Sequence, residues 1–201
     1  MNSKSWDERY AGEDLVWSAE PNRFLVEQVA GLAPGRALDV ACGEGRNAIW
    51  LAEQGFQVTG VDFSAVGLDK ARRLAAARGV EVDFVEADVL SWRPPEASFD
   101  LVVLMYLQLG RDEMAQVLGH LKGGLAPGGV LLVVGHDTTN LTEGAGGPQN
   151  PAVLYSPDDL VAELGGLEVE QAERVRRPIG DGERVAIDAL VRARQPAAPP
   201  V

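Results

Sequence analysis

Short apolar runs alternate with amphipathic stretches along most of the chain. The apolar runs have strand length and cover residues 37–41, 56–62, 80–88, 99–106 and 128–137. The intervening stretches 47–54, 64–79 and 111–124 have helical spacing and end at or beside glycine. Because the strand-like runs are continuously apolar, helices are expected to cover both faces of each strand. The pattern predicts a doubly wound α/β fold on a parallel sheet.

The two ends of the chain depart from this alternation. Near the N-terminus, Pro21 is expected in the first turn of a helix that stops at Gly31. A further helix is predicted over residues 156–165. Two strand-like runs, 167–177 and 183–193, then flank the turn sequence PIGDG. These two runs are expected to pair as an antiparallel hairpin.

The composition is that of a soluble globular protein. A length of 201 residues fits one domain, which we assign to residues 1–193 with a helical and aromatic N-terminal cap over 1–34. Residues 194–201, rich in proline and alanine, are expected to form a disordered tail. The polar N-terminus and the single cysteine indicate a cytoplasmic protein without disulfides. The net charge of -12 argues against binding to nucleic acid or anionic membranes.

The sequence DVACGEGRNA, residues 39–48, follows the first predicted strand. In a doubly wound sheet, ligands bind at the carboxyl ends of the strands, and the loop after the first strand is a usual contact. Gly43 and Gly45 would let the main chain approach a ligand closely, and the next helix would offer free N–H groups. Asp62, at the end of the second strand, is placed to accept hydrogen bonds from ribose hydroxyls. The ligand is therefore predicted to contain a nucleoside.

Two cofactor classes fit this loop. The spacing of the two glycines and Ala48 also satisfies the dinucleotide fingerprint, so an NAD(P)-dependent oxidoreductase is an alternative. Asp39, just before the loop, would oppose a pyrophosphate but could pair with an amino group, which favours a cofactor carrying a cation. Asp88 and the N–H of Val89, after the third strand, could bind an adenine. The closing hairpin also stands where a dinucleotide fold would have its second half.

Five segments resemble, in this order, the class I S-adenosylmethionine-dependent methyltransferases: LDVACGEGRNA, VTGVDFS, VEADV, FDLVVLMY and LAPGGVLLV. The resemblance covers about residues 20 to 193. The segments WDERYAGEDLVWSAEPN and GRNAIWLAEQG are similar to the small-molecule methyltransferases of the tellurite-resistance and thiopurine type. The resemblance implies a seven-stranded sheet of order 3-2-1-4-5-7-6 with strand 7 antiparallel. It also implies in-line transfer of a methyl group from S-adenosyl-L-methionine to O, N, S or a metalloid of a small-molecule acceptor, with S-adenosyl-L-homocysteine as product.

The resemblance assigns parts of the cofactor to particular residues. Asp39 and the backbone from Gly43 to Gly45 would hold the methionine part, Asp62 the ribose, and Asp88 with Val89 the adenine. The further expected cofactor contacts are Tyr10, Trp17, Cys42, Arg46, Asn47, Phe63 and Met105.

Several of these residues also have a simpler interpretation. Trp6, Tyr10 and Trp17 could fold over the sulfonium through cation–π attraction or simply pin the terminal segment to the core. Arg46 and Asn47 could face a carboxylate or solvent at the start of their helix. Cys42 is interpreted as a small packing residue within the loop, because methyl transfer needs no thiol nucleophile. Ala41 stands where the family more often has glycine, and it is expected to keep a negative φ.

The candidate catalytic residues are His136 and Tyr106. His136 closes the fifth strand at the edge that faces the cleft, so it is the candidate general base; the alternative is a histidine satisfied by local hydrogen bonds. Tyr106, after the fourth strand, could line the acceptor pocket or belong to the core. The glycine-rich loop within 136–155 could be a lid or a surface loop without function.

Three further inferences concern what the chain lacks or leaves open. The arginines at 174, 176 and 177 are expected on a surface strand without a role in the site. The two histidines lie on different predicted elements, so no metal site is expected. A module that binds the cofactor without catalysis is a third functional hypothesis, and nothing in the sequence indicates the oligomeric state.

Overall fold

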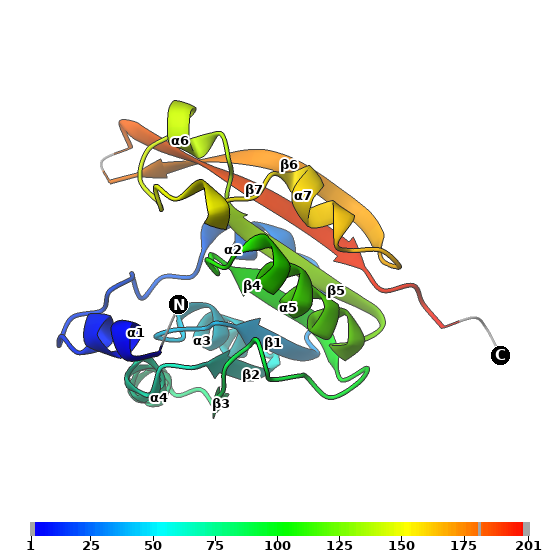
Figure 1. Cartoon of the computed structure of the whole chain (residues 1–201). Helices are drawn as coiled ribbons and strands as arrows, with labels where there is room; N and C mark the ends of the chain where they lie inside the picture. Colours follow the sequence, from blue (N-terminus) through cyan, green and yellow to red (C-terminus); the bar gives the residue numbers. More distant parts are fainter. Residues whose placement is uncertain (1–2, 181, 199–201) are drawn as a thin grey trace.

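A seven-stranded sheet forms the centre of the protein (Figure 1). The computed structural model describes residues 3–180 and 182–198. The strand order is β3-β2-β1-β4-β5-β7-β6, and β7 runs antiparallel to both of its neighbours. The strands are β1 (Arg36–Val40), β2 (Gln57–Asp62), β3 (Asp83–Glu86), β4 (Phe99–Met105), β5 (Leu125–His136), β6 (Glu168–Ile179) and β7 (Arg184–Arg194). This topology confirms the predicted fold class and strand order.

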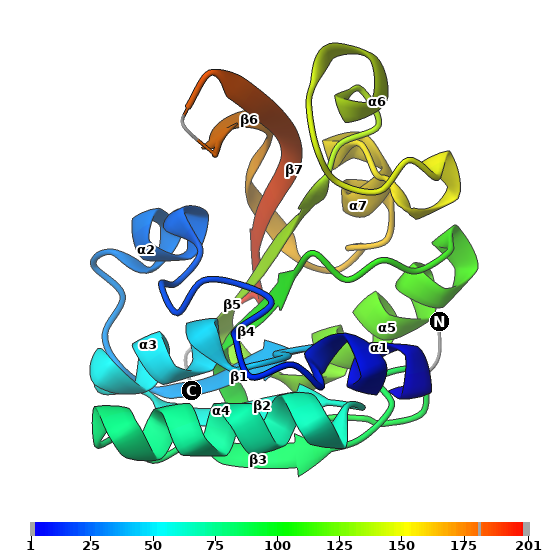
Figure 2. The same ribbon diagram turned by 90° about the vertical axis from the view of Figure 1, so that its left-hand side faces the viewer.

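Helices cover both faces of the sheet. They are α1 (Ser3–Tyr10), α2 (Arg23–Val29), α3 (Arg46–Glu53), α4 (Ala65–Arg78), α5 (Arg111–Gly124), α6 (Asn140–Glu143) and α7 (Pro157–Ala162), with a 3-10 turn η1 (Pro151–Val153). One apolar core joins α2 and α3 to the sheet, and a second joins α5 and α7 to the other face. Figures 1 and 2 show α5 and α7 across the sheet from α2 and α3. Two buried layers hold the strands between them, as the continuously apolar runs predicted.

Local sequence explains where the elements begin and end. The Ser64 hydroxyl accepts a hydrogen bond from the N–H of Gly67, 3.0 Å away, at the start of α4. Gly79 ends that helix in the left-handed conformation, with φ of 69°. In the middle of the sheet, Ala37 of β1 pairs in parallel with Val58 of β2 and Leu101 of β4. The carboxyl ends of these three strands therefore meet at one edge of the sheet.

Three local predictions were wrong. Pro21 precedes α2 rather than lying in its first turn, because Asn22 is the N-cap and its side chain accepts from the N–H of Phe24. The third strand covers only Asp83–Glu86, not 80–88. Arg194 ends β7, so residue 194 belongs to the sheet and not to the predicted tail; residues 199–201 of that prediction lie outside the described part. Residue propensities alone do not predict which backbone groups form the hydrogen bonds that set these bounds.

No helix within residues 3–180 and 182–198 is long and apolar enough to span a bilayer.

Candidate active site

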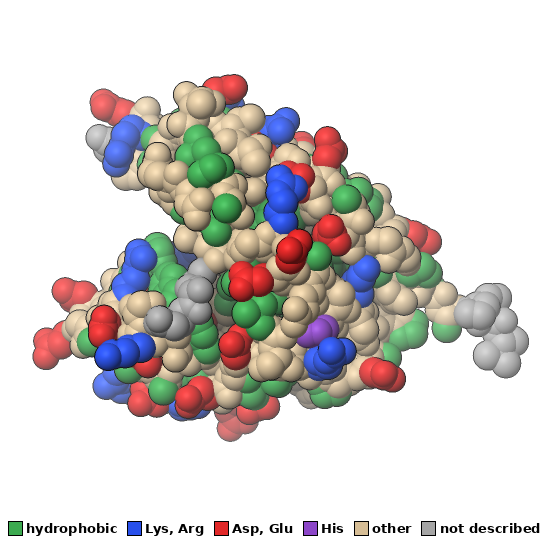
Figure 3. Space-filling view, in the orientation of Figure 1, with side chains coloured by type: hydrophobic (Ala, Val, Ile, Leu, Met, Phe, Trp, Pro, Cys, Tyr) green, Lys and Arg blue, Asp and Glu red, His purple; other side chains and the backbone are tan. Residues whose placement is uncertain are grey.

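A cavity of about 190 Å³ opens at the carboxyl ends of β1, β2 and β4. Figure 3 shows the molecule hollowed between the side that carries the N-terminal helix and the side that carries the β6–β7 hairpin. A smaller pocket of about 30 Å³ adjoins the cavity. Both hollows are lined by Ala41, Asp62, Phe63 and Leu107. The two spaces therefore form one continuous site with Asp62 at their junction.

The glycine loop after β1 forms one wall of the cavity. Gly43 has φ of 55° and lines the cavity, and a Cβ atom there would lie 2.7 Å from the Tyr10 hydroxyl. Gly45, with φ of 81°, is packed against Ala71 and Phe84 and is not among the residues that line the cavity. Of the two glycines, only Gly43 lines the cavity, and the close approach of its main chain to a ligand stays a prediction. Gly45 instead lets the loop pack against α4 and β3.

Ala41 lies in the left-handed region, with φ of 55°, so the prediction of a negative φ was wrong. The N–H of Cys42 donates to the carbonyl of Val61, 3.0 Å away, and this bond ties the turn to the end of β2. A non-glycine residue in this conformation costs about 1–2 kcal/mol. Tyr106, across the cavity, also has a positive φ, of 59°. Two strained residues thus line the same cavity, which is where such strain tends to be kept.

Asp62 is the acidic residue best placed to contact a ligand. Its side chain accepts hydrogen bonds from the N–H groups of Gly43, at 2.8 Å, and Ser64, at 2.9 Å. Only 5% of Asp62 is exposed, and burial raises its pKa. Each carboxylate oxygen has two acceptor positions, so the two backbone bonds leave capacity for ligand hydroxyls. The geometry fits the ribose contact predicted for this residue.

Asp39 lies beneath the loop and not on the cavity wall. It is 1% exposed, and its Oδ2 atom has no hydrogen-bond partner among the described residues. Burial raises the pKa of Asp39 to about 7. Asp39 lines neither of the two hollows. The predicted contact with the methionine part therefore stays a prediction, and the positive charge that faces Asp39 from the protein is Arg46.

The smaller pocket brings together the residues predicted to bind adenine. Asp88 and Val89 line it with apolar neighbours that include Phe63 and Leu109. The Oδ1 atom of Asp88 accepts from the N–H of Leu90 at 2.9 Å, which fixes the turn after β3. The exposed carboxylate keeps further acceptor capacity beside an apolar slot. Such a slot suits a flat heterocycle with an exocyclic amine.

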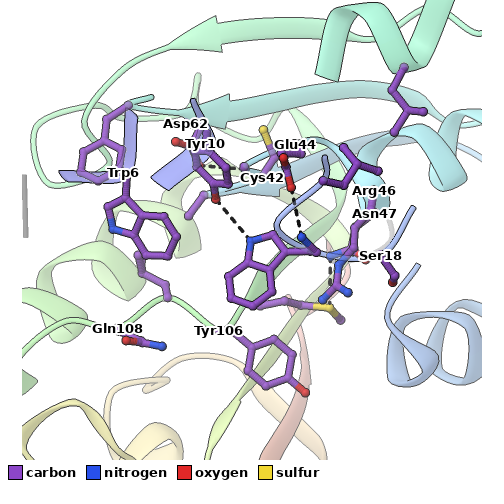
Figure 4. A pocket seen from close by; sticks show the side chains of 18 of the residues that line it. Trp6, Tyr10, Ser18, Cys42, Glu44, Arg46, Asn47, Asp62, Tyr106 and Gln108 are labelled. Atoms are coloured by element: carbon purple, nitrogen blue, oxygen red, sulfur yellow. Dashed lines mark hydrogen bonds between the residues drawn. The ribbon is translucent and has the colours of Figure 1, made fainter. Parts of the chain in front are cut away.

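Aromatic side chains from the N-terminal segment cover the cavity. Trp6, Tyr10 and Trp17 all line it, and the Trp17 Nε1–H donates to the Tyr10 hydroxyl at 3.4 Å (Figure 4). The rings of Trp6 and Tyr10 lie 5.5 Å apart, and the guanidinium of Arg9 lies 5.0 Å from the rings of both tryptophans. Burial raises the pKa of Tyr10, so its hydroxyl stays protonated. The segment therefore contributes directly to the site.

A buried ion pair, missed in the sequence, holds this segment in place. Glu44 lies between the two glycines and is 4% exposed. Its carboxylate accepts from the N–H groups of Val16 and Trp17, at 2.9 and 3.2 Å, and from Lys70 Nζ at 3.1 Å. Lys70 also donates to the carbonyl of Asp14. One side chain of the glycine loop is thus bonded to both α4 and the N-terminal cover.

The far wall of the cavity carries a polar cluster around Asp188. The register of β5 with β7 places His136 opposite Asp188, and their Nδ1 and Oδ1 atoms lie 3.2 Å apart, without the alignment of a hydrogen bond. The Tyr106 hydroxyl donates a hydrogen bond to Asp188 at 2.8 Å. The Nε–H of Arg177 donates to the same carboxylate at 2.7 Å. Burial alone would raise the pKa of Asp188, but the contacts of His136 and Arg177 lower it. The carboxylate therefore stays charged in a fully buried position.

Two of these residues, Arg177 and Asp188, were not among the predicted site residues. Arg177 lies on the largely exposed edge strand β6, as expected, but it also lines the cavity, whereas Arg176 is exposed. Arg174 pairs with the buried Asp137. A buried acid in an apolar strand, ERVAIDALVRA, was the signal that could have pointed to the cluster, because a buried charge needs a partner.

The remaining predicted contacts lie around the same cavity. Asn47 accepts from the N–H of Asn22 at 2.9 Å and donates to the Met105 sulfur at 3.6 Å. Cys42 lines the cavity, and burial raises its pKa, which keeps it a thiol. Arg46 also lines it (Figure 4). Figure 4 shows Asp62 and Tyr10 on one side of the cavity and Tyr106 on the other.

The glycine-rich loop lies away from the cavity. None of residues 138–153 is among the cavity's lining residues. The loop carries α6 and η1 and is bonded to β7, where the N–H of Ile187 donates to Asn140 Oδ1 at 2.7 Å and the N–H of Ala145 to the carbonyl of Val185. Gly147 packs against the ring of His136. The loop supports the far wall from behind.

Comparisons with known proteins agree with this architecture. A family model described as "Methyltransferase domain" matches residues 37–129. A demethylmenaquinone methyltransferase of Thermus thermophilus is 41% identical over 125 residues, which cover 61% of this chain and 55% of the relative. The chain thus spans about half the length of the curated relatives that it matches.

Two solved structures share the fold. One concerns the conversion of a disulfide bond into a thioacetal group during echinomycin biosynthesis; it is 26% identical, with a TM-score of 0.79 over 96% of this chain and 91% of that chain. TehB from Haemophilus influenzae is 17% identical, with a TM-score of 0.73 over 96% of this chain and 66% of that chain.

The sheet order and the cavity at its carboxyl edge define a Rossmann-like methyltransferase fold. Residues 37–129 match a methyltransferase domain, and the sheet order is that of the class I S-adenosylmethionine-dependent methyltransferases, whose cofactor is S-adenosylmethionine. This similarity disfavours the nicotinamide alternative. In the described part of the chain, β5 is followed by the antiparallel hairpin and not by a second mononucleotide half.

Proposed function

We propose that this protein transfers the methyl group of S-adenosylmethionine to a small-molecule acceptor by in-line displacement. The observation that carries the proposal is the continuity of the two hollows, which meet at Asp62 and lead to the polar cluster around Asp188. The residues present fit the cofactor: an acceptor carboxylate at the junction, an apolar slot beside Asp88, and glycine backbone at the loop. When bound, the cofactor supplies an electrophilic methyl group on a sulfonium centre.

Each part of the site has a defined task in this proposal. Asp62 binds the ribose, while Asp88 and Val89 bind the adenine. The backbone at Gly43, with Asn47, Phe63 and Met105 beside it, surrounds the methionine part. Tyr10, Trp17 and the neighbouring Trp6 exclude water from the reacting atoms. Alignment of the two reactants then provides up to about 7–11 kcal/mol of the barrier reduction.

His136 is the proposed general base for acceptors that must lose a proton. Its ring faces the cavity 5.0 Å from the ring of Tyr106, and Asp188 lies next to its Nδ1 atom. The negative charge of the carboxylate near Nδ1 favours a proton on that nitrogen, which leaves Nε2 as the acceptor of the substrate proton. Tyr106 is already bonded to Asp188 and Arg177, so its task is to position that cluster.

The His136→Ala variant is expected to lower turnover about 10²- to 10⁴-fold at neutral pH, because the proton acceptor is lost. Affinity for S-adenosylhomocysteine should remain that of the unmodified protein. The assay follows S-adenosylhomocysteine release with a panel of thiols, phenols, amines, carboxylic acids and oxyanions. His120→Ala is the matched control, since His120 lies on α5 and does not line the cavity.

Unchanged turnover in His136→Ala would assign His136 to local packing. If protein that binds the cofactor releases no S-adenosylhomocysteine with any compound of the panel, the result would instead support the non-catalytic module.

A further inference from the structure

Two guanidinium groups from separate elements line the cavity near the polar cluster around Asp188, the region that we call the acceptor end. Arg46 comes from the start of α3 and Arg177 from β6, and both line the cavity. Arg177 is 23% exposed as a side chain, and its Cζ atom lies 5.2 Å from the centroid of the Tyr106 ring. Burial lowers the pKa of Arg46 and the charge of Arg177 lowers it further, so the two groups lie within electrostatic range, and each guanidinium has donors in a planar fork.

Asp188 balances only one of these charges. Its two oxygens receive Arg177 Nε at 2.7 Å, Arg177 Nη2 at 3.3 Å and the Tyr106 hydroxyl at 2.8 Å. His136 Nδ1 lies 3.2 Å from the same carboxylate. Asp188 is fully buried behind these groups. Its negative charge is therefore neutralised by these side chains of the cavity wall and does not face the cavity.

Arg46 has no hydrogen-bond or ion-pair partner among the described residues, although its side chain is only partly exposed. Of the groups that face it, Asp39 is the carboxyl, and burial raises the pKa of Asp39 to about 7. At neutral pH that carboxyl is therefore only partly ionised. Arg46 is thus a cation of the cavity wall without a paired carboxylate among the described residues, in a protein whose net charge is -12.

Apolar side chains make up much of the cavity lining. They include Trp6, Leu15, Trp17, Leu74, Met105 and Leu107. An inorganic oxyanion would leave these surfaces without a partner. An organic molecule with an apolar body and one acidic group would satisfy both the walls and the guanidinium groups.

We propose that the methyl acceptor is an organic carboxylate, whose acidic group is bound between Arg177 and Arg46. This inference rests on the proposed methyltransferase function and names the class of its acceptor. A planar carboxylate accepts two parallel hydrogen bonds from a guanidinium, so the two side chains would fix both its position and its orientation. His136, next to Arg177 through Asp188, would then lie beside the part of the acceptor that receives the methyl group.

The cofactor also has a carboxylate, on its methionine part, and Arg46 is close enough to the glycine loop to be a partner for it. The test therefore has two arms. In the first, protein saturated with S-adenosylhomocysteine is titrated by calorimetry with benzoate and with benzamide, which share a ring but differ in charge. In the second, protein alone is titrated with S-adenosylhomocysteine and with 5′-methylthioadenosine, which lacks the carboxylate.

Benzoate is expected to bind at least about tenfold more tightly than benzamide, which corresponds to roughly 1.4 kcal/mol of binding free energy. Arg177→Gln and Arg46→Gln should each remove that preference and leave affinity for S-adenosylhomocysteine unchanged. Arg176→Gln is the control, because Arg176 is exposed on the same strand. Arg177→Gln removes the partner of Asp188 and could therefore unfold the protein. Arg46→Gln breaks no ion pair among the described residues, so it tests the proposal even in that case.

Equal binding of benzoate and benzamide, or a preference that survives both substitutions, would overturn the proposal. It is also overturned if Arg46→Gln weakens S-adenosylhomocysteine but not 5′-methylthioadenosine, because Arg46 then serves the cofactor. Failure of S-adenosylhomocysteine to bind the unmodified protein would contradict the proposed function itself, which separates the two failures.

Discussion

Replacing Glu44 by alanine is expected to lower the free energy of unfolding by about 3–5 kcal/mol, the usual effect of removing one partner of a buried ion pair. Lys70, with only 8% of its side chain exposed, would keep its charge without the carboxylate that it now contacts at 3.1 Å. The N–H groups of Val16 and Trp17 would lose their acceptor as well. Chemical denaturation of both proteins, followed by circular dichroism, measures the difference.

A surface ion pair of similar geometry provides the control. Glu53 and Arg78 lie 3.0 Å apart, but their side chains are 27% and 36% exposed. Glu53→Ala is therefore expected to cost about 0–1 kcal/mol. The double variant Glu44→Gln, Lys70→Met should recover most of the lost stability, because it leaves no buried charge unpaired. A loss below 1 kcal/mol for Glu44→Ala would show that the pair does not hold the N-terminal cover.

Replacing Asp62 by alanine is expected to weaken S-adenosylhomocysteine about 100-fold. A hydrogen bond to a charged group contributes about 1.5–3 kcal/mol, and Asp62 has capacity for two ribose hydroxyls beyond its bonds to Gly43 and Ser64. Two such bonds amount to roughly 3 kcal/mol at the lower limit, and each 1.4 kcal/mol is tenfold. Calorimetric titration of the variant, after a thermal melt has shown that it is folded, gives the affinity.

Asp83→Ala is the matched control for Asp62. Asp83 lies on the neighbouring strand β3, its side chain is exposed, and it lines neither hollow. Its replacement should leave the affinity unchanged. An affinity of Asp62→Ala within threefold of the unmodified protein would mean that Asp62 only shapes the loop.

The elements of the fold could be predicted because their signals are local. The helix α5 has the predicted bounds, 111–124, and α4 begins and ends at its capping residues Ser64 and Gly79. The parallel sheet followed from continuously apolar strands. The strand order came from the resemblance to a family and not from periodicity, since periodicity does not say which strands are neighbours.

The sequence predicted the site residues that lie in the glycine loop and at the strand ends. It did not predict the site residues that form pairs between distant positions of the chain. Gly43, Asp62 and Val89 follow strands whose ends must meet in a parallel sheet. Glu44 and Lys70 are 26 positions apart, and Tyr106 and Asp188 are 82 apart. Such pairs depend on strand register and on the path of the N-terminal segment.

Ala41 shows the same limit within a loop. Its positive φ accompanies the hydrogen bond from the N–H of Cys42 to the carbonyl of Val61, a contact between the loop after β1 and strand β2 that the loop sequence alone does not specify.

The central claim is that the hollow at the carboxyl edge of the sheet binds an adenosyl sulfonium and not a dinucleotide. Calorimetric titration of the monodisperse protein with S-adenosylmethionine and, separately, with NADH tests this claim most directly. The account predicts saturable binding of S-adenosylmethionine at one site per chain and no binding of NADH. Binding of NADH, or no heat with S-adenosylmethionine from folded protein, would contradict it.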